Sequence, residues 1–122
     1  MKLLNDFFQI VALDSGEEIV GEVQMNPAHS IYHAHFPGNP ITPGVCLVQM
    51  STEILEMAIN RRLQLKTAIK IKFRKPMGPS VRPTFIFQKL KVSEQQVSVQ
   101  VTVEDQDTQY AKMNLMYNVT GQ

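Results

Sequence analysis

The amino-acid sequence predicts an α+β fold in which an antiparallel sheet wraps around one long central helix. One observation is that residues 44–63 form a long helical pattern whose circumference is mostly apolar. The other is that two strand-like segments precede this helix and four follow it, with short turns between them. Because helix and strands are segregated along the chain, the class is α+β. The 122 residues suit a single domain over positions 1–122.

The chain is expected to begin with a β-hairpin. Residues 7–13 are apolar and rich in strand formers, and residues 14–17 have the composition of a tight turn. Residues 19–25 alternate apolar and polar side chains, which is typical of a half-buried strand. Asn26-Pro27 should end the second strand, because proline cannot donate a ladder hydrogen bond.

The predicted helix at residues 44–63 has recognisable start signals. Thr42 is a candidate N-cap, and Pro43 suits the first helical position, where its missing N–H costs nothing. The polar side chains recur at helical spacing as one narrow stripe, formed by Gln49, Glu53, Glu56 and Asn60. A helix with this pattern should be largely enclosed by the sheet, with its polar stripe solvated.

Four strand-like segments follow, at residues 67–75, 82–92, 96–104 and 109–119. The third is the clearest, because valines alternate with polar residues through positions 97–103. Short turns between the segments predict an antiparallel meander.

Composition and charge argue against several classes of function. The net charge is +1, and no basic run is long enough to indicate nucleic-acid binding. No apolar run approaches the ~20 residues of a membrane-spanning helix, and the first residues lack the apolar core of a signal peptide. The single cysteine, Cys46, excludes an internal disulfide and is expected to be a small buried side chain. We therefore expect a soluble, cytoplasmic protein.

Three histidines lie close together, at His29, His33 and His35. Their spacing raises the question of a metal site, but no Cys–Cys or His–Glu pattern stands beside them to complete four ligands. We therefore expect no bound metal. His29 is interpreted as a surface loop residue, and His33 as a residue that packs near the site.

A rigid loop leads from the last histidine into the helix. Residues 35–44 read His-Phe-Pro-Gly-Asn-Pro-Ile-Thr-Pro-Gly, and their three prolines and two glycines stiffen the loop and allow close approach of the backbone to a ligand. The first N–H groups of the helix point out of its end and favour negative charge there.

This stretch resembles the signature of the 3-hydroxyacyl-[acyl carrier protein] dehydratases of the hot-dog fold, His-Phe-Pro-Gly-x-Pro-Ile-x-Pro-Gly-Val, which is intact here at residues 35–45. A second, weaker match lies at residues 73–79, where Phe-Arg-Lys-Pro-x-x-Pro is similar to the family's Phe-Lys-Arg-Pro-x-x-Pro-Gly. The family's catalytic Glu or Asp follows the histidine by fourteen residues, and that position is Gln49 here. The resemblance implies a hot-dog fold, an acyl thioester substrate, a homodimer or a higher oligomer of dimers, and neither a metal nor a redox cofactor.

The resemblance also implies roles for individual residues. His35 would be the base, since neutral imidazole accepts a proton near working pH, and the N–H of Gly44 would hold the thioester oxygen. In that family the carboxylate that handles the hydroxyl comes from the partner subunit, whereas Gln49 forms hydrogen bonds but cannot deliver a proton. The residues expected to line the substrate site are Phe36, Pro37, Gly38, Pro43 and Val45.

Glu53 offers one route to a restored acid. The family commonly has Glu and then Gln four residues later, and this chain has the reverse order, Gln49 and then Glu53. Positions i and i+4 lie one above the other, about 5–6 Å apart, so Glu53 could supply the acid if the site shifts by one turn. The plainer interpretation, which we favour, is that Glu53 and Glu56 belong to the solvated stripe of the helix.

We predict a 3-hydroxyacyl-[acyl carrier protein] dehydratase-like protein of fatty-acid or related lipid or polyketide synthesis, whose partner is acyl carrier protein or an acyl thioester. The alternative is a non-catalytic relative that binds acyl chains or the carrier protein, or that serves as a subunit of a hetero-complex. The loss of the carboxylate at Gln49 supports this alternative. A thioesterase is the third hypothesis, and it is less favoured because thioesterases of this fold usually lack the His-Phe-Pro-Gly loop.

Overall fold

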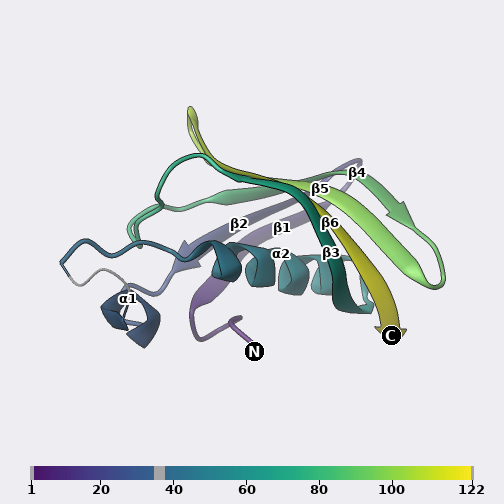
Figure 1. Cartoon of the computed structure of the whole chain (residues 1–122), viewed down its shortest axis with the longest axis horizontal. Helices are drawn as coiled ribbons and strands as arrows, with labels where there is room; N and C mark the ends of the chain where they lie inside the picture. The colour runs from purple at the N-terminus through teal and green to yellow at the C-terminus, as the bar shows by residue number, and fades with distance from the viewer. Residues whose placement is uncertain (1, 35–37, 122) are drawn as a thin grey trace.

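The computed structural model describes residues 2–34 and 38–121. A hairpin comes first, then two helices, then four strands. In chain order the elements are β1 (Phe8–Ser15), β2 (Ile19–Met25), α1 (Ser30–Ala34), α2 (Gly44–Ile59), β3 (Arg62–Phe73), β4 (Thr84–Val92), β5 (Gln96–Asp105) and β6 (Thr108–Gly121). The described strands form one antiparallel sheet in the order β1-β2-β4-β5-β6-β3. Figure 1 shows this sheet curving over α2, which confirms the predicted α+β arrangement.

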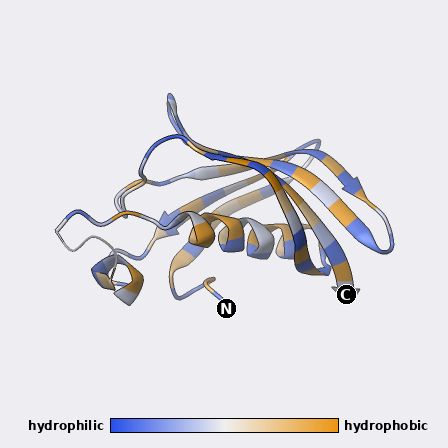
Figure 2. Ribbon diagram, viewed as in Figure 1, coloured by the Kyte–Doolittle hydropathy of each residue, from blue (hydrophilic) through white to orange (hydrophobic). Residues whose placement is uncertain are grey.

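The core lies between the sheet and α2. Alternate residues of β5 and β6 are buried on the same face, because cross-strand partners in an antiparallel pair share a face; they are Val97, Val99, Val101, Val103, Ala111, Met113, Leu115 and Tyr117. Met50, Ile54 and Leu55 of α2 are fully buried. Hydrophobic and hydrophilic residues alternate along these strands in Figure 2, as the period-2 pattern predicts.

The prediction that the helix reaches position 63 is wrong. The helix ends at Ile59, because Asn60 adopts the left-handed conformation (φ 54°, ψ 52°) that commonly terminates helices. The chain then reverses, and β3 begins at Arg62 rather than at position 67. The N–H of Leu63 donates to Oε2 of Glu56 at 2.9 Å, so this helix side chain holds the start of the strand.

Thr42 is not the N-cap of α2. Pro43 occupies that position in an extended conformation, without a side-chain capping bond. The hydroxyl of Thr42 instead pairs with the hydroxyl of Tyr32 at 2.8 Å, and its N–H donates to the carbonyl of Met77 at 2.7 Å. Thr42 therefore fixes the loop before α2 to α1 on one side and to the β3–β4 connection on the other.

The two predictions about the histidines have different outcomes. His29 lies in the loop before α1, as predicted, although its side chain is only 13% exposed: its ring lies edge-on to the ring of Phe7 (centroids 5.2 Å apart) and is 3.1 Å from a carboxylate oxygen of Asp6. His33 does not pack near the site, because it lies exposed at the end of the short helix α1. His35 falls outside the described residues. Within the described residues, no three metal-ligating side chains form a group that could hold an ion.

Candidate functional site

The loop between α1 and α2 is fixed at both of its described ends. Tyr32 is buried, stacks on the ring of Phe7 with centroids 5.1 Å apart, and meets Thr42 through the hydroxyl pair. Burial raises the pKa of Tyr32 to about 12, so the phenol stays protonated and can donate this hydrogen bond. The predicted base His35 and the predicted substrate-binding residues Phe36 and Pro37 lie between these anchors, outside the described residues.

Pro43 and Gly44 open α2 and line a cavity of about 380 Å³. The cavity lies between the start of the helix and the end of β3, and its other walls include Ile41, Leu47, Phe73, Pro76 and Met77. The first N–H groups of a helix have no acceptor within the helix, so this end suits an oxygen that gains negative charge. Of the other predicted substrate-binding residues, Gly38 is exposed with φ 86°, and Val45 is 67% exposed.

Gln49 and Glu53 lie together, one turn apart on α2. Nε2 of Gln49 donates to Oε2 of Glu53 at 2.9 Å. The N–H of Leu3 donates to both oxygens of Glu53, at 3.0 and 2.9 Å, and the N–H of Leu4 donates to Oε1 at 2.7 Å. Glu53 is only 6% exposed. The interpretation of Glu53 as part of a solvated stripe is therefore wrong, because the N-terminal segment folds over it.

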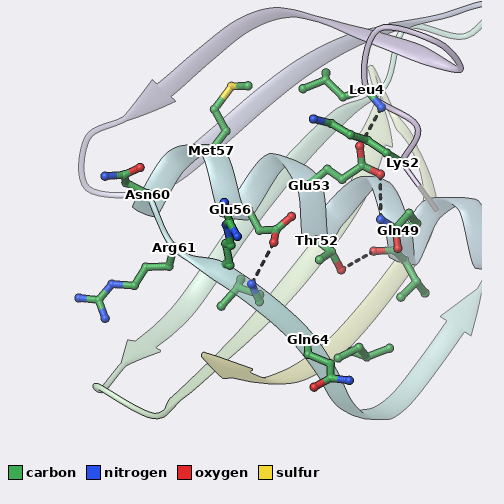
Figure 3. A pocket seen from close by; sticks show the side chains of 14 residues that line it. Lys2, Leu4, Gln49, Thr52, Glu53, Glu56, Met57, Asn60, Arg61 and Gln64 are labelled. Carbon is green, nitrogen blue, oxygen red and sulfur yellow. Dashed lines mark hydrogen bonds between the residues drawn. The ribbon is translucent and has the colours of Figure 1, made fainter. Parts of the chain in front are cut away.

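A groove of about 800 Å³ runs along this side of the molecule, between the N-terminal segment, α2 and β3. Figure 3 shows Gln49, Thr52, Glu53 and Glu56 along the helix that forms its floor. Three cationic residues stand on its walls, namely Lys2, Arg61 and Arg62. The structure thus divides the predicted residues between two sites, because Gly44 lines the cavity at the helix start whereas Gln49 and Glu53 line the groove.

Helix geometry explains this division. Gly44 and Glu53 are nine residues apart, which corresponds to about 13 Å along a helix that rises ~1.5 Å per residue. A group held at the N-H of Gly44 therefore lies far from the carboxylate of Glu53 in the same chain. Gln49 is closer to Gly44, at about 7–8 Å along the axis by the same rise.

One buried polar pair was not predicted from the sequence. The hydroxyls of Thr52 and Tyr117 pair at 3.0 Å beneath α2, and burial raises the pKa of Tyr117 to about 12. Cys46 was predicted to be buried, and this is confirmed by its 3% exposure. Burial also raises the pKa of its thiol, which disfavours the reactive thiolate.

Among the described helices, none has both the length and the apolar character to span a membrane.

Comparison with solved structures shows that this protein has a hot-dog fold. A hypothetical thioesterase with coenzyme A from Streptococcus pneumoniae TIGR4 matches with a TM-score of 0.67 and 16% identity, over 94% of this chain and 87% of that chain. The dehydratase heterocomplex ApeI:P from Xenorhabdus doucetiae also gives a TM-score of 0.67, with 15% identity over 89% of this chain and 96% of that chain. At these identities the likeness concerns the fold.

Sequence comparison identifies the family. The profile of the ApeI-like family, described as ApeI dehydratase, matches residues 12–114, so the chain belongs to this family. The FabZ 3-hydroxyacyl-[acyl-carrier-protein] dehydratase of Desulfotalea psychrophila is 27% identical over 92 residues, covering 68% of this chain and 61% of that protein. The FabZ of Oenococcus oeni is 31% identical over 78 residues, covering 58% and 56%. The chain thus spans about three-fifths of the length of these curated relatives.

Proposed function

We propose that this chain is a subunit of a 3-hydroxyacyl thioester dehydratase that acts on acyl groups carried by acyl carrier protein, in fatty-acid or related lipid or polyketide synthesis. The observation that carries the proposal is membership of the ApeI-like dehydratase family over the segment that contains the intact signature at residues 35–45. A cytoplasmic location fits this substrate. The thioesterase alternative rests on structural likeness alone, which does not determine a reaction.

The reaction divides between a base, an electrophile and an acid. In this proposal His35 removes the proton next to the thioester carbonyl, and the N–H of Gly44 stabilises the enolate oxygen that forms. Phe36, Pro37, Gly38 and Pro43 hold the substrate against the start of the helix. The hydroxyl on C3 then receives a proton and leaves as water; as the C3–O bond breaks, the enolate electrons form a new double bond between C2 and C3 and the carbonyl is restored.

The source of that last proton distinguishes this chain from its relatives. Gln49 occupies the position of the family's acid and has no proton to give. Glu53 accepts hydrogen bonds from Leu3, Leu4 and Gln49, so it would have to release those donors to protonate a hydroxyl. These contacts favour the hetero-complex hypothesis, in which a partner subunit supplies the acid. A dehydratase heterocomplex among the structural neighbours gives this hypothesis a precedent.

The surface formed by α2 and β3 suits such a partner. β3 is the last strand of the sheet, and an open strand edge is a template for pairing with another chain. Large hydrophobic side chains are exposed on these two elements, namely Val45, Met57, Leu65, Ile69 and Phe73. We propose that a second hot-dog chain, either a copy of this one or a relative with a carboxylate at the position of Gln49, binds here.

A complementation experiment tests three parts of the proposal together: the base His35, an acid at position 49, and a site shared between two subunits. Hydration of crotonyl and longer 2-enoyl thioesters is followed by loss of the conjugated absorbance, for wild type, for the double variant His35→Ala/Gln49→Glu, and for a refolded mixture of both. The mixture alone should be active, because only the mixed dimer joins an intact His35 to a new carboxylate on the other chain. Wild type mixed with the single variant His35→Ala is the control and should stay inactive.

Other outcomes have defined meanings. If wild type alone turns over the thioesters and Glu53→Gln abolishes the activity while its circular dichroism spectrum stays that of the folded protein, the acid has moved by one helical turn. A different outcome is that wild type and every mixture show no turnover, while both wild type and His35→Ala bind acyl carrier protein. In that case the dehydratase proposal is wrong, and the non-catalytic hypothesis replaces it.

A further inference from the structure

β3 contains a bulge immediately before its last residues. Ile69 pairs with Asn114 and Lys72 with Lys112, so three steps along β3 match two along β6. Lys70 lies in this segment with φ 53°, a left-handed conformation that lysine adopts only at a cost. Bulges of this kind often lie next to functional sites, where they redirect a side chain.

The residue redirected here is Phe73. It pairs with Ala111, which is fully buried on the face of β6 that packs against α2. Without the extra residue, Lys72 would pair with Ala111, and Phe73 would lie on the opposite face. The bulge therefore exchanges a lysine for an aromatic ring at the start of α2.

The ring lies directly against Gly44. A Cβ atom added to Gly44 would be 2.5 Å from Cζ, 2.6 Å from Cε2 and 3.0 Å from Cε1 of Phe73, so a larger residue at position 44 would force the ring to move away from the helix start. Phe73 is nevertheless 52% exposed, because one side of the ring contacts the helix start and the rest remains open. A core aromatic would be covered on both sides, so core packing does not account for this placement.

We propose that Phe73 is a specificity-determining residue whose open ring surface contacts the acyl carbons next to the thioester carbonyl. The inference rests on the proposed function, which places the carbonyl oxygen at the N–H of Gly44. Groups attached to that carbonyl then lie beside the ring, in the cavity of about 380 Å³ that Ile41, Leu47 and Met77 also line. The ligand expected at the ring is therefore the 2-enoyl form of the acyl thioester, whose conjugated first carbons are planar and can lie on an aromatic face.

A fluorescent substitution tests this contact without requiring turnover. The sequence has no tryptophan, so Phe73→Trp introduces a single reporter. Val92→Trp is the matched control, because Val92 is 45% exposed at the end of β4, away from both the cavity and the proposed partner surface. Titration with trans-2-decenoyl-CoA should change the emission of Phe73→Trp saturably and leave that of Val92→Trp unchanged. Binding to wild type in calorimetry without any change in the Phe73→Trp emission would overturn the inference.

A truncation measures the size of the effect. Half of the ring is open for contact, and burial of that much apolar surface corresponds to about a tenfold change in affinity. We expect Phe73→Ala to weaken binding of decenoyl-CoA about tenfold, Val92→Ala to stay within about twofold of wild type, and both variants to unfold in urea like wild type. If Phe73→Ala and wild type bind decenoyl-CoA with equal affinity, the role of Phe73 is contradicted, but the proposed function is not. Absence of both binding and turnover of every thioester by wild type would instead refute the proposed function, and this inference with it.

Discussion

The bond network around Glu53 leads to a prediction about stability. The carboxylate is 6% exposed, and its hydrogen bonds join residues fifty positions apart in the sequence. Glu53→Gln keeps the shape of the side chain but removes the charge and replaces one acceptor oxygen by an NH₂ donor, which faces other donors. With the amide oxygen at the Oε1 position, Leu3 and Leu4 both donate to it and the Nε2 donor of Gln49 faces the new NH₂ group; in the opposite orientation the N–H of Leu4 loses its acceptor.

The expected size follows from these contacts. Hydrogen bonds to a charged group each contribute about 1.5–3 kcal/mol, and a buried donor without a partner costs about 1–3 kcal/mol. Because one of the backbone bonds survives in Glu53→Gln, we expect the free energy of unfolding to fall by about 2–4 kcal/mol. A loss of this size is a large part of the ~5–15 kcal/mol by which domains are usually stable.

Urea unfolding followed by circular dichroism measures the change. Glu94→Gln is the matched control, because Glu94 is exposed in the turn between β4 and β5, and its effect should stay within about 0.5 kcal/mol. Hydrogen exchange adds a local readout, since the amides of Leu3 and Leu4 should exchange faster in Glu53→Gln than in wild type. If Glu53→Gln unfolds at the same urea midpoint as Glu94→Gln, the carboxylate does not anchor the N-terminal segment.

Two further predictions concern buried titratable groups. Burial raises the pKa of Tyr32 and Tyr117 from 10.0 to about 12, so the unfolded chain ionises first. The free energy of unfolding should therefore be intact below pH 10 and fall as the pH rises towards 12, with a shallower fall in Tyr117→Phe; a flat profile would contradict this. Cys46 is buried and its thiol pKa is raised, so native protein at neutral pH should react with a thiol reagent only as fast as it opens, whereas labelling at the unfolded rate would show that the helix start is accessible.

The sequence predicted the elements that depend on a regular period. The hairpin and the last strands alternate with a period of two, and their buried faces followed from that pattern. The end of α2 could not be predicted in this way, because Ile59 and Leu63 are four residues apart and continue the helical period. The left-handed conformation of Asn60 ends the helix, and Leu63 becomes a strand residue paired with Val119.

The parts of the site that sequence missed are contacts between distant segments. The signature at residues 35–45 indicated the loop and the glycine at the helix start, but not that the hydroxyl of Thr42 would meet Tyr32. In a regular strand, Ile69 and Phe73 would share a face, whereas the bulge at Lys70 separates them. Such a bulge leaves no mark in the alternation of apolar and polar residues.

The reversed order of Gln49 and Glu53 has a physical explanation. Because Glu53 is buried beneath Leu3 and Leu4, a second carboxylate one turn away would repel it and would remove the donor that Gln49 provides. A glutamine at position 49 donates to Glu53 instead, so Gln49 supports the anchoring of the N-terminal segment. In the proposed function this chain would contribute the base and the helix start to a site shared with a partner, while Gln49 and Glu53 hold its own N-terminal segment.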